Sequence, residues 1–314
     1  MKISFIISAY NRRELVLKCL NSIFAYATQP FEVIYIDEFS TDGTIEAVKM
    51  RFPLVKIVVC NLRGAAPTKN FGANYATGEL IAFIDSDAEI TENWSDVVRS
   101  SFLRDRRLGV MGFKVVSPYD RKLQEAGGLI SPIFTYVNRV RLKIDINRPS
   151  YVYSVIGAAI VVRRKLFMEL GKFDDDFLYT SEEPDFCWRV WMAGYKVLYV
   201  PIVVYHRGCT SKYGIGYAAS QKDRMRTLFK LSVKNALVSF LKNGELATVT
   251  KFFVPQIFYY FIWVSKEKFP EAMLLGILEF LKDFKKSVNK RRIIQRRRRL
   301  SDKVIKKIVG TCYI

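Results

Sequence analysis

The chain has 314 residues, half of them hydrophobic, so it can bury a sizeable core and global disorder is excluded. Its formal net charge is +20, and residues 222–314 carry 22 Lys and Arg against 7 Asp and Glu. A C-terminal third this basic indicates an anionic partner, which is either a nucleic acid or a membrane surface.

Two features bear on the compartment. The five cysteines are scattered without a CxxC pair, so we expect reduced thiols in a cytosolic protein rather than a zinc site or a disulfide framework. No apolar run reaches about 18 residues, and charged residues follow the first apolar stretch at once. We therefore expect neither a signal peptide nor a transmembrane helix.

In the first ninety residues, short apolar runs alternate with segments of helical period. The runs predict buried strands at residues 3–8, 31–36, 54–59 and 80–84, and the helices between them cover about residues 12–26, 42–51 and 67–75. Strict alternation with short connections is typical of a parallel sheet covered by helices, so the predicted fold class is α/β.

Asp85 and Asp87 follow the fourth predicted strand directly. Residues i and i+2 of an extended segment project to the same side, so both carboxylates can face one ligand, and their like charges require a cation between them. Carboxylate oxygens suit Mg²⁺ or Mn²⁺, completed by substrate phosphates. A solvated acidic turn explains these two residues equally well.

Polar residues also follow two other strands. Ser8, Ala9 and Tyr10 come at the end of the first, and Asp37 ends the second. Because open α/β sheets bind ligands at the carboxyl ends of their strands, these residues and the Asp85–Asp87 turn favour one nucleotide site. The sequence has neither GxGxxG nor GxxxxGK[ST], which argues against a dinucleotide fold and a P-loop.

Six short motifs follow one another in a characteristic order and spacing. They are Ile6-Ile7-Ser8-Ala9-Tyr10-Asn11, Asp37 with Ser40-Thr41-Asp42-Gly43-Thr44, Asn61-x-Arg63-Gly64, Lys69-Asn70-x-Gly72, Gly78-Glu79 and Asp85-Ser86-Asp87. Together they resemble the nucleotide-diphospho-sugar half of family 2 glycosyltransferases, of the rhamnosyltransferase-like or dolichol- and polyprenol-pathway type. The resemblance implies a GT-A fold, a Rossmann-like, mostly parallel central sheet flanked by helices. The sequence departs from the family pattern at Ser8, where Pro is frequent, and at Glu38-Phe39.

The resemblance also implies roles for individual residues. It places the donor's base against Ser8, Ala9, Tyr10 and Asp37, the base or phosphates near Arg63 and Lys69, the ribose near Asp85 and Ser86, and the metal on Asp87.

The acceptor is expected in the middle of the chain. Gly157 and Ala158 open a predicted strand, and their small side chains let a sugar approach closely. Pro184 is predicted at the first position of a helix, with Glu183 as its cap. Acids are stable at a helix N-terminus in any case. The resemblance to the family's acidic acceptor motif implies instead that Glu183 is the general base.

The same motif makes Asp185 the alternative base and puts Glu182 and Trp188 near the acceptor. His206 is the only histidine in the chain. A single histidine is more often structural, but the resemblance implies that this one completes the metal site with Asp87. The implied activity is metal-dependent, inverting transfer of a hexose-type sugar to a hydroxyl group.

Beyond residue 220 the composition changes. Aromatic and apolar stretches at residues 254–264 and 272–284 lie beside clusters such as Arg296–Arg299. Apolar residues next to clustered cations favour an interfacial element on an anionic membrane and disfavour nucleic acid. The alternative is a solvated basic tail packed on the catalytic domain.

We therefore predict a GT-A domain at residues 1–220 and a helical, basic, membrane-associating region at residues 221–314. The predicted protein is a cytoplasmic glycosyltransferase on the cytoplasmic face of a membrane. It transfers a sugar to a glycan or a polyprenyl- or dolichyl-linked acceptor in polysaccharide or glycolipid biosynthesis. The competing hypotheses are a non-catalytic nucleotide-sugar-binding scaffold and a nucleic-acid-binding protein that acts through its basic tail.

Overall fold

The computed structural model describes residues 1–142, 144–155, 157–208, 221–266 and 269–311. Cys209, Cys312 and the segment directly after Gly208 lie outside the described residues. The described cysteines Cys19, Cys60 and Cys187 are buried and free. No helix within the described ranges is long and apolar enough to cross a membrane.

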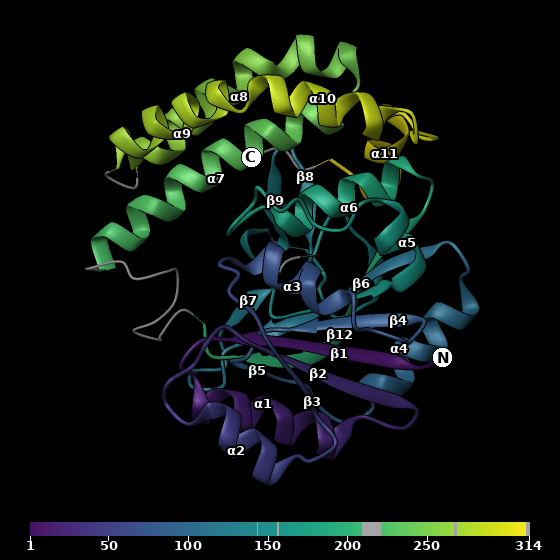
Figure 1. Cartoon of the computed structure of the whole chain (residues 1–314). Coiled ribbons are helices and arrows are strands. Elements are labelled where there is room, and N and C mark those ends of the chain that lie inside the picture. Colours follow the sequence, from purple (N-terminus) through teal and green to yellow (C-terminus); the bar gives the residue numbers. More distant parts are fainter. Residues whose placement is uncertain (143, 156, 209–220, 267–268, 312–314) are drawn as a thin grey trace.

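A mixed sheet forms the centre of the molecule (Figure 1). Its main path runs in the order β10-β12-β6-β11-β4-β1-β2-β3, with β5 and β7 pairing at the sides. The strands are β1 (Ile3–Ala9), β2 (Phe31–Asp37), β3 (Lys56–Val59), β4 (Leu80–Ile84), β5 (Ala88–Glu89), β6 (Leu108–Val116), β7 (Leu123–Glu125), β10 (Ser150–Tyr151), β11 (Ala159–Arg163) and β12 (Lys196–His206). A separate hairpin pairs β8 (Gly128–Ile130) with β9 (Tyr136–Asn138).

The parallel half of the sheet is the predicted one. β1 pairs in parallel with both β2 and β4, and β3 extends β2 in the same direction. Strand β11 runs antiparallel between β4 and β6 and joins this half to the half that contains β6, β12 and β10. The carboxyl ends of β1, β2 and β4 therefore share one edge, as the α/β pattern requires.

Helices cover both faces of the sheet (Figure 1). Within β1, Ile3, Phe5 and Ile7 face a core shared with α1 (Arg13–Tyr26), α2 (Thr44–Arg51) and α4 (Trp94–Arg104), because alternate residues of a strand project to opposite sides. Ile6 faces the other core, shared with α3 (Ala65–Ala73), α5 (Arg164–Glu169) and α6 (Glu182–Met192). Strand β1 is thus buried on both sides, as its continuous apolar run predicts.

The C-terminal region folds into helices α7 (Gln221–Asn243), α8 (Leu246–Lys266), α9 (Pro270–Lys282), α10 (Phe284–Gln295) and α11 (Asp302–Val309). They form a further layer beyond α6 (Figure 1). Phe240 and Val233 of α7 belong to the same hydrophobic core as Phe186 and Trp188 of α6. The predicted division near residue 220 stays a prediction, and both sides of it contribute to one core.

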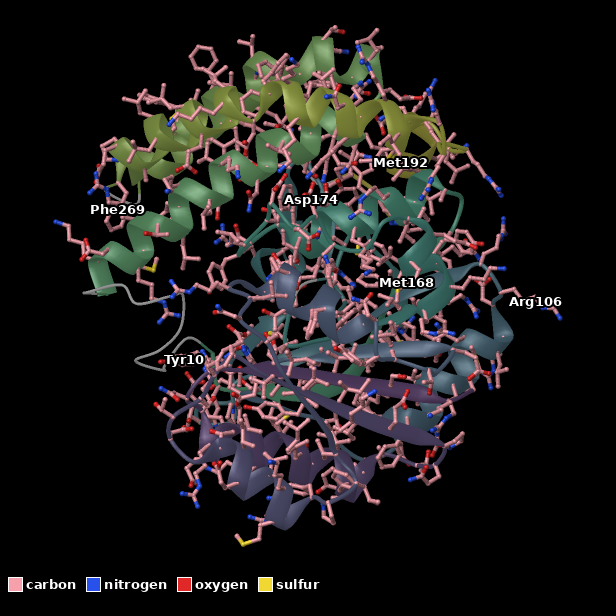
Figure 2. The ribbon with its side chains drawn as sticks, viewed as in Figure 1. Tyr10, Arg106, Met168, Asp174, Met192 and Phe269 are labelled. Carbon is pink, nitrogen blue, oxygen red and sulfur yellow. The ribbon has the colours of Figure 1, made fainter. Side chains whose placement is uncertain are left out.

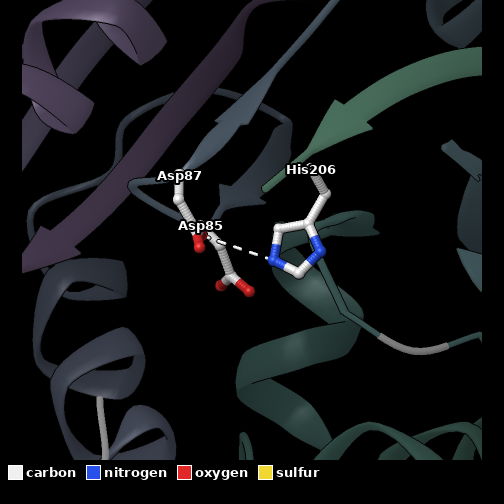
Figure 3. Close-up of side chains that lie close together, drawn as sticks. All are labelled: Asp85, Asp87 and His206. Carbon is white, nitrogen blue, oxygen red and sulfur yellow. Dashed lines mark ion pairs between the residues drawn. The ribbon is translucent and has the colours of Figure 1, made fainter. Parts of the chain in front are cut away.

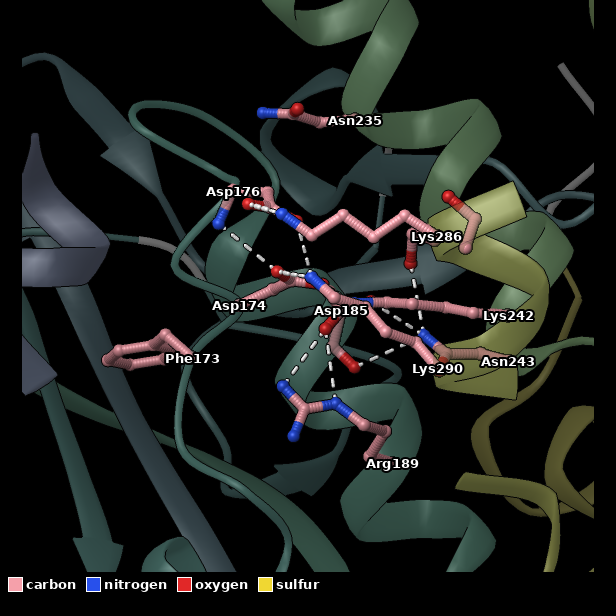
Figure 4. A network of polar contacts seen from close by, with 12 residues as sticks. Phe173, Asp174, Asp176, Asp185, Arg189, Asn235, Lys242, Asn243, Lys286 and Lys290 are labelled. Carbon is pink, nitrogen blue, oxygen red and sulfur yellow. Dashed lines mark hydrogen bonds and ion pairs between the residues drawn. The ribbon is translucent and has the colours of Figure 1, made fainter. Parts of the chain in front are cut away.

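Ion pairs attach this layer to the loop that precedes α6 (Figure 4). Lys242 and Lys290 both contact Asp174, and Lys290 also lies 2.6 Å from Asp176. Part of the basic excess of the tail is therefore used inside the protein, against the acidic loop of residues 174–176.

One local prediction at α6 is wrong. Ser181, with a φ of +67°, occupies the cap position, and the helix begins at Glu182 rather than at Pro184. Glu182 and Glu183 consequently stand in the first turn, where the helix dipole stabilises their negative charge.

Candidate functional site

Asp85, Asp87 and His206 meet at the carboxyl edge of the sheet (Figure 3). One ligand atom of each lies within 4.8 Å of the others. The strand β4 brings Asp85 and Asp87 to this edge, and β12 brings His206, which pairs with Ala88 of β5. The Nε2 atom of His206 lies 3.3 Å from Oδ1 of Asp87.

Gln124 of β7 orients the imidazole of His206 through Nδ1, the ring nitrogen that does not face Asp87. Its Oε1 lies 2.8 Å from Nδ1 of His206, and its Nε2 donates a 3.1 Å hydrogen bond to the His206 carbonyl. When Nδ1 carries the proton and donates it to Gln124, Nε2 presents a lone pair toward Asp87. This is the arrangement of a histidine that ligates a metal, so the donor set of two carboxylates and one imidazole fits a divalent cation.

The electrostatics of the cluster follow from its burial. Burial alone would raise the pKa of Asp87. When His206 is protonated on both ring nitrogens, its Nε2–H donates to Asp87, and this hydrogen bond together with the charges of His206 and Arg12 lowers the pKa of Asp87 below its usual range. Arg12 also donates a 3.3 Å hydrogen bond to Ser86. Asp87 is therefore an ionised carboxylate at neutral pH.

Lys69 connects this cluster to the acidic end of α6. Its Nζ lies 3.4 Å from Oδ1 of Asp85 and 3.4 Å from Oε1 of Glu183, although the two acids are far apart in the sequence. Burial would lower the pKa of Lys69, but Asp85, Glu183 and Glu182 together raise it. A permanently charged amine thus lies between the two groups of carboxylates.

Glu182 and Glu183 both have raised pKa values. Burial is the main cause for each, and it raises the pKa of Glu182 to about 8, with the charge of Glu183 adding to the effect. The charge of Lys69 acts in the opposite direction on both. A carboxylate with a raised pKa, next to the sheet edge where a nucleotide is predicted, is suited to accept a proton.

Asp185 has a different environment, although it is only two residues further along α6. Its side chain is fully buried, and its oxygens accept hydrogen bonds from Arg189 (2.9 Å) and Asn243 (2.8 Å) and pair with Lys242 at 3.1 Å. Burial would raise its pKa, but Lys242 and Arg189 lower it. Asp185 is part of the network that attaches the C-terminal helices (Figure 4).

The residues expected to hold the base lie together at the ends of β1 and β2. Ala9 is the register partner of Asp37, and its carbonyl accepts a hydrogen bond from Glu38. Asp37 is fully buried, and its carboxylate accepts hydrogen bonds from Tyr35 and the Ser40 amide, each 2.7 Å long. Asp37 therefore fixes the turn of residues 38–41.

The other predicted donor residues line the same edge. Ser8 and Tyr10 flank Ala9 and are partly exposed, and Ser86 is buried between the two aspartates. Arg63 is exposed in the loop before α3. The structure thus brings these residues to one edge with Lys69 and Asp85.

On the expected acceptor side, the Ala158 carbonyl accepts a 2.9 Å hydrogen bond from the Asp85 amide, so the Gly157–Ala158 turn adjoins the cluster. Gly157 has a φ of +88° and open space where a Cβ would stand. Trp188, in contrast, is 2% exposed and stacks on Phe134 inside the core. Phe240 of α7 also packs against this side chain, and the place of Trp188 in the acceptor region stays a prediction.

Sequence reasoning missed Gln124 and Arg12. Gln124 carries no sequence motif, and nothing local marks a glutamine that contacts a histidine 82 residues away. Arg12 had a signal, because it directly follows the Ser8–Asn11 turn at the predicted nucleotide edge.

A family model described as "Glycosyl transferase family 2" matches residues 4–171, which is more than half of the chain. The chain belongs to glycosyl transferase family 2. The match covers β1 to α5, including Asp85, Asp87 and Lys69, and stops before Glu183 and His206.

Curated relatives of this family 2 member are distant. Over 186 residues it is 28% identical to polypeptide N-acetylgalactosaminyltransferase 10 of Homo sapiens, covering 54% of this chain and 31% of that protein. Over 206 residues it is 22% identical to poly-beta-1,6-N-acetyl-D-glucosamine synthase of Staphylococcus aureus (strain COL), covering 64% of this chain and 48% of that protein. The chain thus spans about a third to a half of the length of these relatives.

Solved structures agree with the fold. GalNAc-T7 with UDP, GalNAc and Mn²⁺ superposes on 90% of this chain and 57% of its own, with a TM-score of 0.64 at 18% identity. The mannosyltransferase PcManGT from Pyrobaculum calidifontis, in complex with GDP-Man and Mn²⁺, covers 90% of this chain and 87% of its own (TM-score 0.53, 19% identity). S. aureus TarS 1-349 in complex with UDP-GlcNAc covers 94% of this chain and 91% of its own, with a TM-score of 0.59 at 16% identity. The predicted GT-A fold is confirmed.

Proposed function

We propose that this glycosyltransferase is a metal-dependent, inverting enzyme. It moves a hexose-type sugar from a nucleotide-diphospho-sugar to a hydroxyl group of a glycan or of a lipid-linked acceptor. The observation that carries the proposal is the arrangement of Asp85, Asp87 and His206 within 4.8 Å of one another, with Lys69 joining that cluster to Glu183. One edge thus combines a cation site with a candidate base.

The donor lies along the carboxyl edge of the sheet. Ser8, Ala9 and Tyr10, with the turn that Asp37 fixes, hold the base, and Asp85 and Ser86 lie at the ribose. Arg63 and Lys69 face the base or the phosphates. The structural neighbours described with UDP, UDP-GlcNAc and GDP-Man support a nucleotide-sugar donor of this kind.

Asp87 and His206 hold a divalent cation, Mg²⁺ or Mn²⁺, with Asp85 beside them. When bound, such a cation offsets the negative charge that develops on the departing nucleoside diphosphate. The Mn²⁺ in two of the neighbour structures supports this assignment. Gln124 keeps the imidazole of His206 turned toward Asp87, which reduces the entropy lost on binding.

Glu183 is the general base. It takes the proton of the acceptor hydroxyl while the hydroxyl oxygen attacks the anomeric carbon and the bond from that carbon to the diphosphate oxygen breaks. Lys69 favours the carboxylate form of Glu183 on which this step depends. We prefer Glu183 to Asp185 because Arg189, Lys242 and Asn243 already engage the oxygens of Asp185.

Gly157, Ala158 and Glu182 lie on the acceptor side of the reacting centre. The acceptor is a glycan or a polyprenyl- or dolichyl-linked sugar at the cytoplasmic face of a membrane, with residues 1–220 as the catalytic part. The basic C-terminal region, residues 221–314, supports attachment to an anionic surface.

The proposal is tested by screening nucleotide sugars with Mn²⁺ or Mg²⁺ by thermal shift, followed by assays of donor hydrolysis and transfer. Wild type is expected to turn over one donor class with the metal present, and Asp87→Ala is expected to lose this turnover. Equal turnover by the two proteins would refute a catalytic role of Asp87, and nucleotide-sugar binding by wild type without turnover would leave a non-catalytic nucleotide-sugar-binding scaffold as the function. The product anomer, read by NMR, is expected to be opposite to that of the donor; the same anomer refutes inversion.

A further inference from the structure

The outer surface of helices α8 and α9 is apolar, although it faces solvent. The exposed side chains on α8 are Val254 (58% exposed), Phe258 (63%), Phe261 and Ile262, and those on α9 are Leu274 (60%), Leu275, Leu278 and Leu281 (58%). We call these eight residues the apolar face. The positions recur every three or four residues, so each set lies along one side of its helix.

The opposite sides of these helices pack against the rest of the protein. Gln256 of α8 donates a hydrogen bond of 2.7 Å to the Ile133 carbonyl, and Phe253 packs on Phe280 of α9. Ala272 and Met273 are buried in the core shared with α7. None of the eight residues of the apolar face belongs to either hydrophobic core of the described residues, and exposed apolar surface of this kind marks an interaction site.

The charges on α9 are sorted between its two sides. The acids Glu271 and Glu279 pair with Arg226 and Lys230 of α7, at 3.5 and 2.7 Å. Lys282, at the end of α9, is exposed and directly follows Leu281 of the apolar face. Lys285 of α10 and Lys251 of α8 are likewise exposed. Exposed cations therefore accompany the apolar face, while the acids of α9 are paired with cations of α7.

We propose that the apolar face docks onto an anionic lipid bilayer, with Lys251, Lys282 and Lys285 at the level of the phosphate headgroups. Apolar side chains enter the acyl boundary and cations contact the lipid phosphates, as in other interfacial helices. This inference deepens the proposed function and rests on it for the acceptor: a bilayer would present a lipid-linked acceptor to the enzyme.

The position of the helices agrees with that use. Tyr10, at the nucleotide edge, and Phe269, which precedes α9, lie toward the same side of the molecule, whereas Arg106 lies toward the other side (Figure 2). The ring of Phe269 stacks on Phe229 of α7 at 5.5 Å, which fixes the start of α9 at this side. A bilayer on the apolar face thus reaches the side of the molecule on which the donor edge opens.

A second copy of the chain fits this surface less well than a bilayer. A two-fold dimer places the same patch of each subunit against the other. The cations that accompany the apolar face would then approach their own copies, in a region with 22 Lys and Arg against 7 Asp and Glu. Like charges brought together oppose such a contact, whereas anionic headgroups neutralise them.

The test is co-sedimentation of the full chain with vesicles of phosphatidylcholine containing about 30% phosphatidylglycerol, and with pure phosphatidylcholine. Wild type is expected to bind the anionic vesicles and to release them as salt rises. Phe258→Glu/Leu278→Glu is expected to lower the partition coefficient roughly tenfold or more, because it removes two apolar anchors and adds charge. Lys282→Glu/Lys285→Glu is expected to remove the preference for anionic vesicles.

A matched control is Leu54→Glu/Leu103→Glu, which alters two apolar residues that are 83% and 65% exposed elsewhere on the surface. It is expected to bind vesicles like wild type. Equal vesicle binding by Phe258→Glu/Leu278→Glu and wild type, or no binding by wild type, overturns the proposal. A wild-type dimer in sedimentation velocity that Phe258→Glu/Leu278→Glu dissociates, without vesicle binding, assigns the face to a second copy.

Donor hydrolysis without vesicles separates this proposal from the proposed function. All of these variants lie outside the donor edge and are expected to hydrolyse the donor like wild type. If wild type did not hydrolyse any donor, the proposed function would be refuted. The vesicle-binding measurements would still test the apolar face.

Discussion

Replacing Lys242 by methionine tests how the C-terminal helices are attached to the catalytic region. The Lys242 side chain is 1% exposed, contacts Asp174 and lies 3.1 Å from Asp185 (Figure 4). Its ammonium also lies 4.6 Å from the centre of the Phe177 ring. Methionine preserves most of the apolar stem and removes only the charge, so two buried carboxylates lose a shared partner.

The magnitude follows from what remains. Removing one member of a buried ion pair costs about 3–5 kcal/mol, because the other charge stays buried without compensation. Here Asp174 keeps Lys290, and Asp185 keeps Arg189 and Asn243. We therefore expect the lower end of the range, a loss of about 3 kcal/mol in the free energy of unfolding.

The assay is urea denaturation followed by circular dichroism at neutral pH. Burial would raise the pKa values of Asp174 and Asp185, but Lys242 and its neighbours lower them. The stabilisation is thus fully present above the unfolded carboxyl pKa of about 3.9 and is lost as pH falls toward the folded values. The difference between Lys242→Met and wild type should shrink in acid.

Lys286→Met is the matched control. Lys286 pairs with Asp176 at 2.6 Å, but its side chain is 57% exposed, so its removal should cost at most about 1 kcal/mol. If Lys242→Met lost no more stability than Lys286→Met, the ion-pair network would not be what attaches the tail, and the apolar core would be sufficient.

Three further predictions concern the active site. Glu183→Gln should lower the rate of transfer about 10²–10⁴-fold while nucleotide binding, measured by calorimetry, is unchanged; retained transfer would move the role of the base to Asp185. Gln124→Leu should weaken Mn²⁺ binding roughly 10–100-fold in a calorimetric titration, because His206 loses the partner that orients it, and unchanged affinity would show that this hydrogen bond is dispensable. Lys69→Met should shift the acid limb of the pH–rate profile upward, since Glu183 acts as a carboxylate and Lys69 lowers its pKa; a downward shift would contradict the assigned charge relation.

The sequence alone determined the first half of the fold and much of the nucleotide edge. Strands buried on both faces appear as continuous apolar runs, and parallel strands bring their carboxyl ends to one edge. These are local or topological rules, so Asp85 and Asp87 could be placed beside Ser8 and Asp37 before any contact was known. The ordered motifs predicted the family, and the family model that matches residues 4–171 confirms this prediction.

Only the tertiary structure decided which side chains share an environment. Asp185 and Glu183 are two residues apart on α6, yet helix α7 pairs with one while Lys69 of α3 faces the other. Trp188 belongs to the core because α7 covers it.

The same limit applies to the basic tail. The composition gives the number of charged residues in the tail. Only the folded structure shows which cations pair with Asp174 and Asp176 and which lie exposed near the apolar face. The physical reason is that a side chain's burial and charge partners come from segments distant in the chain, and the local sequence pattern carries no record of them.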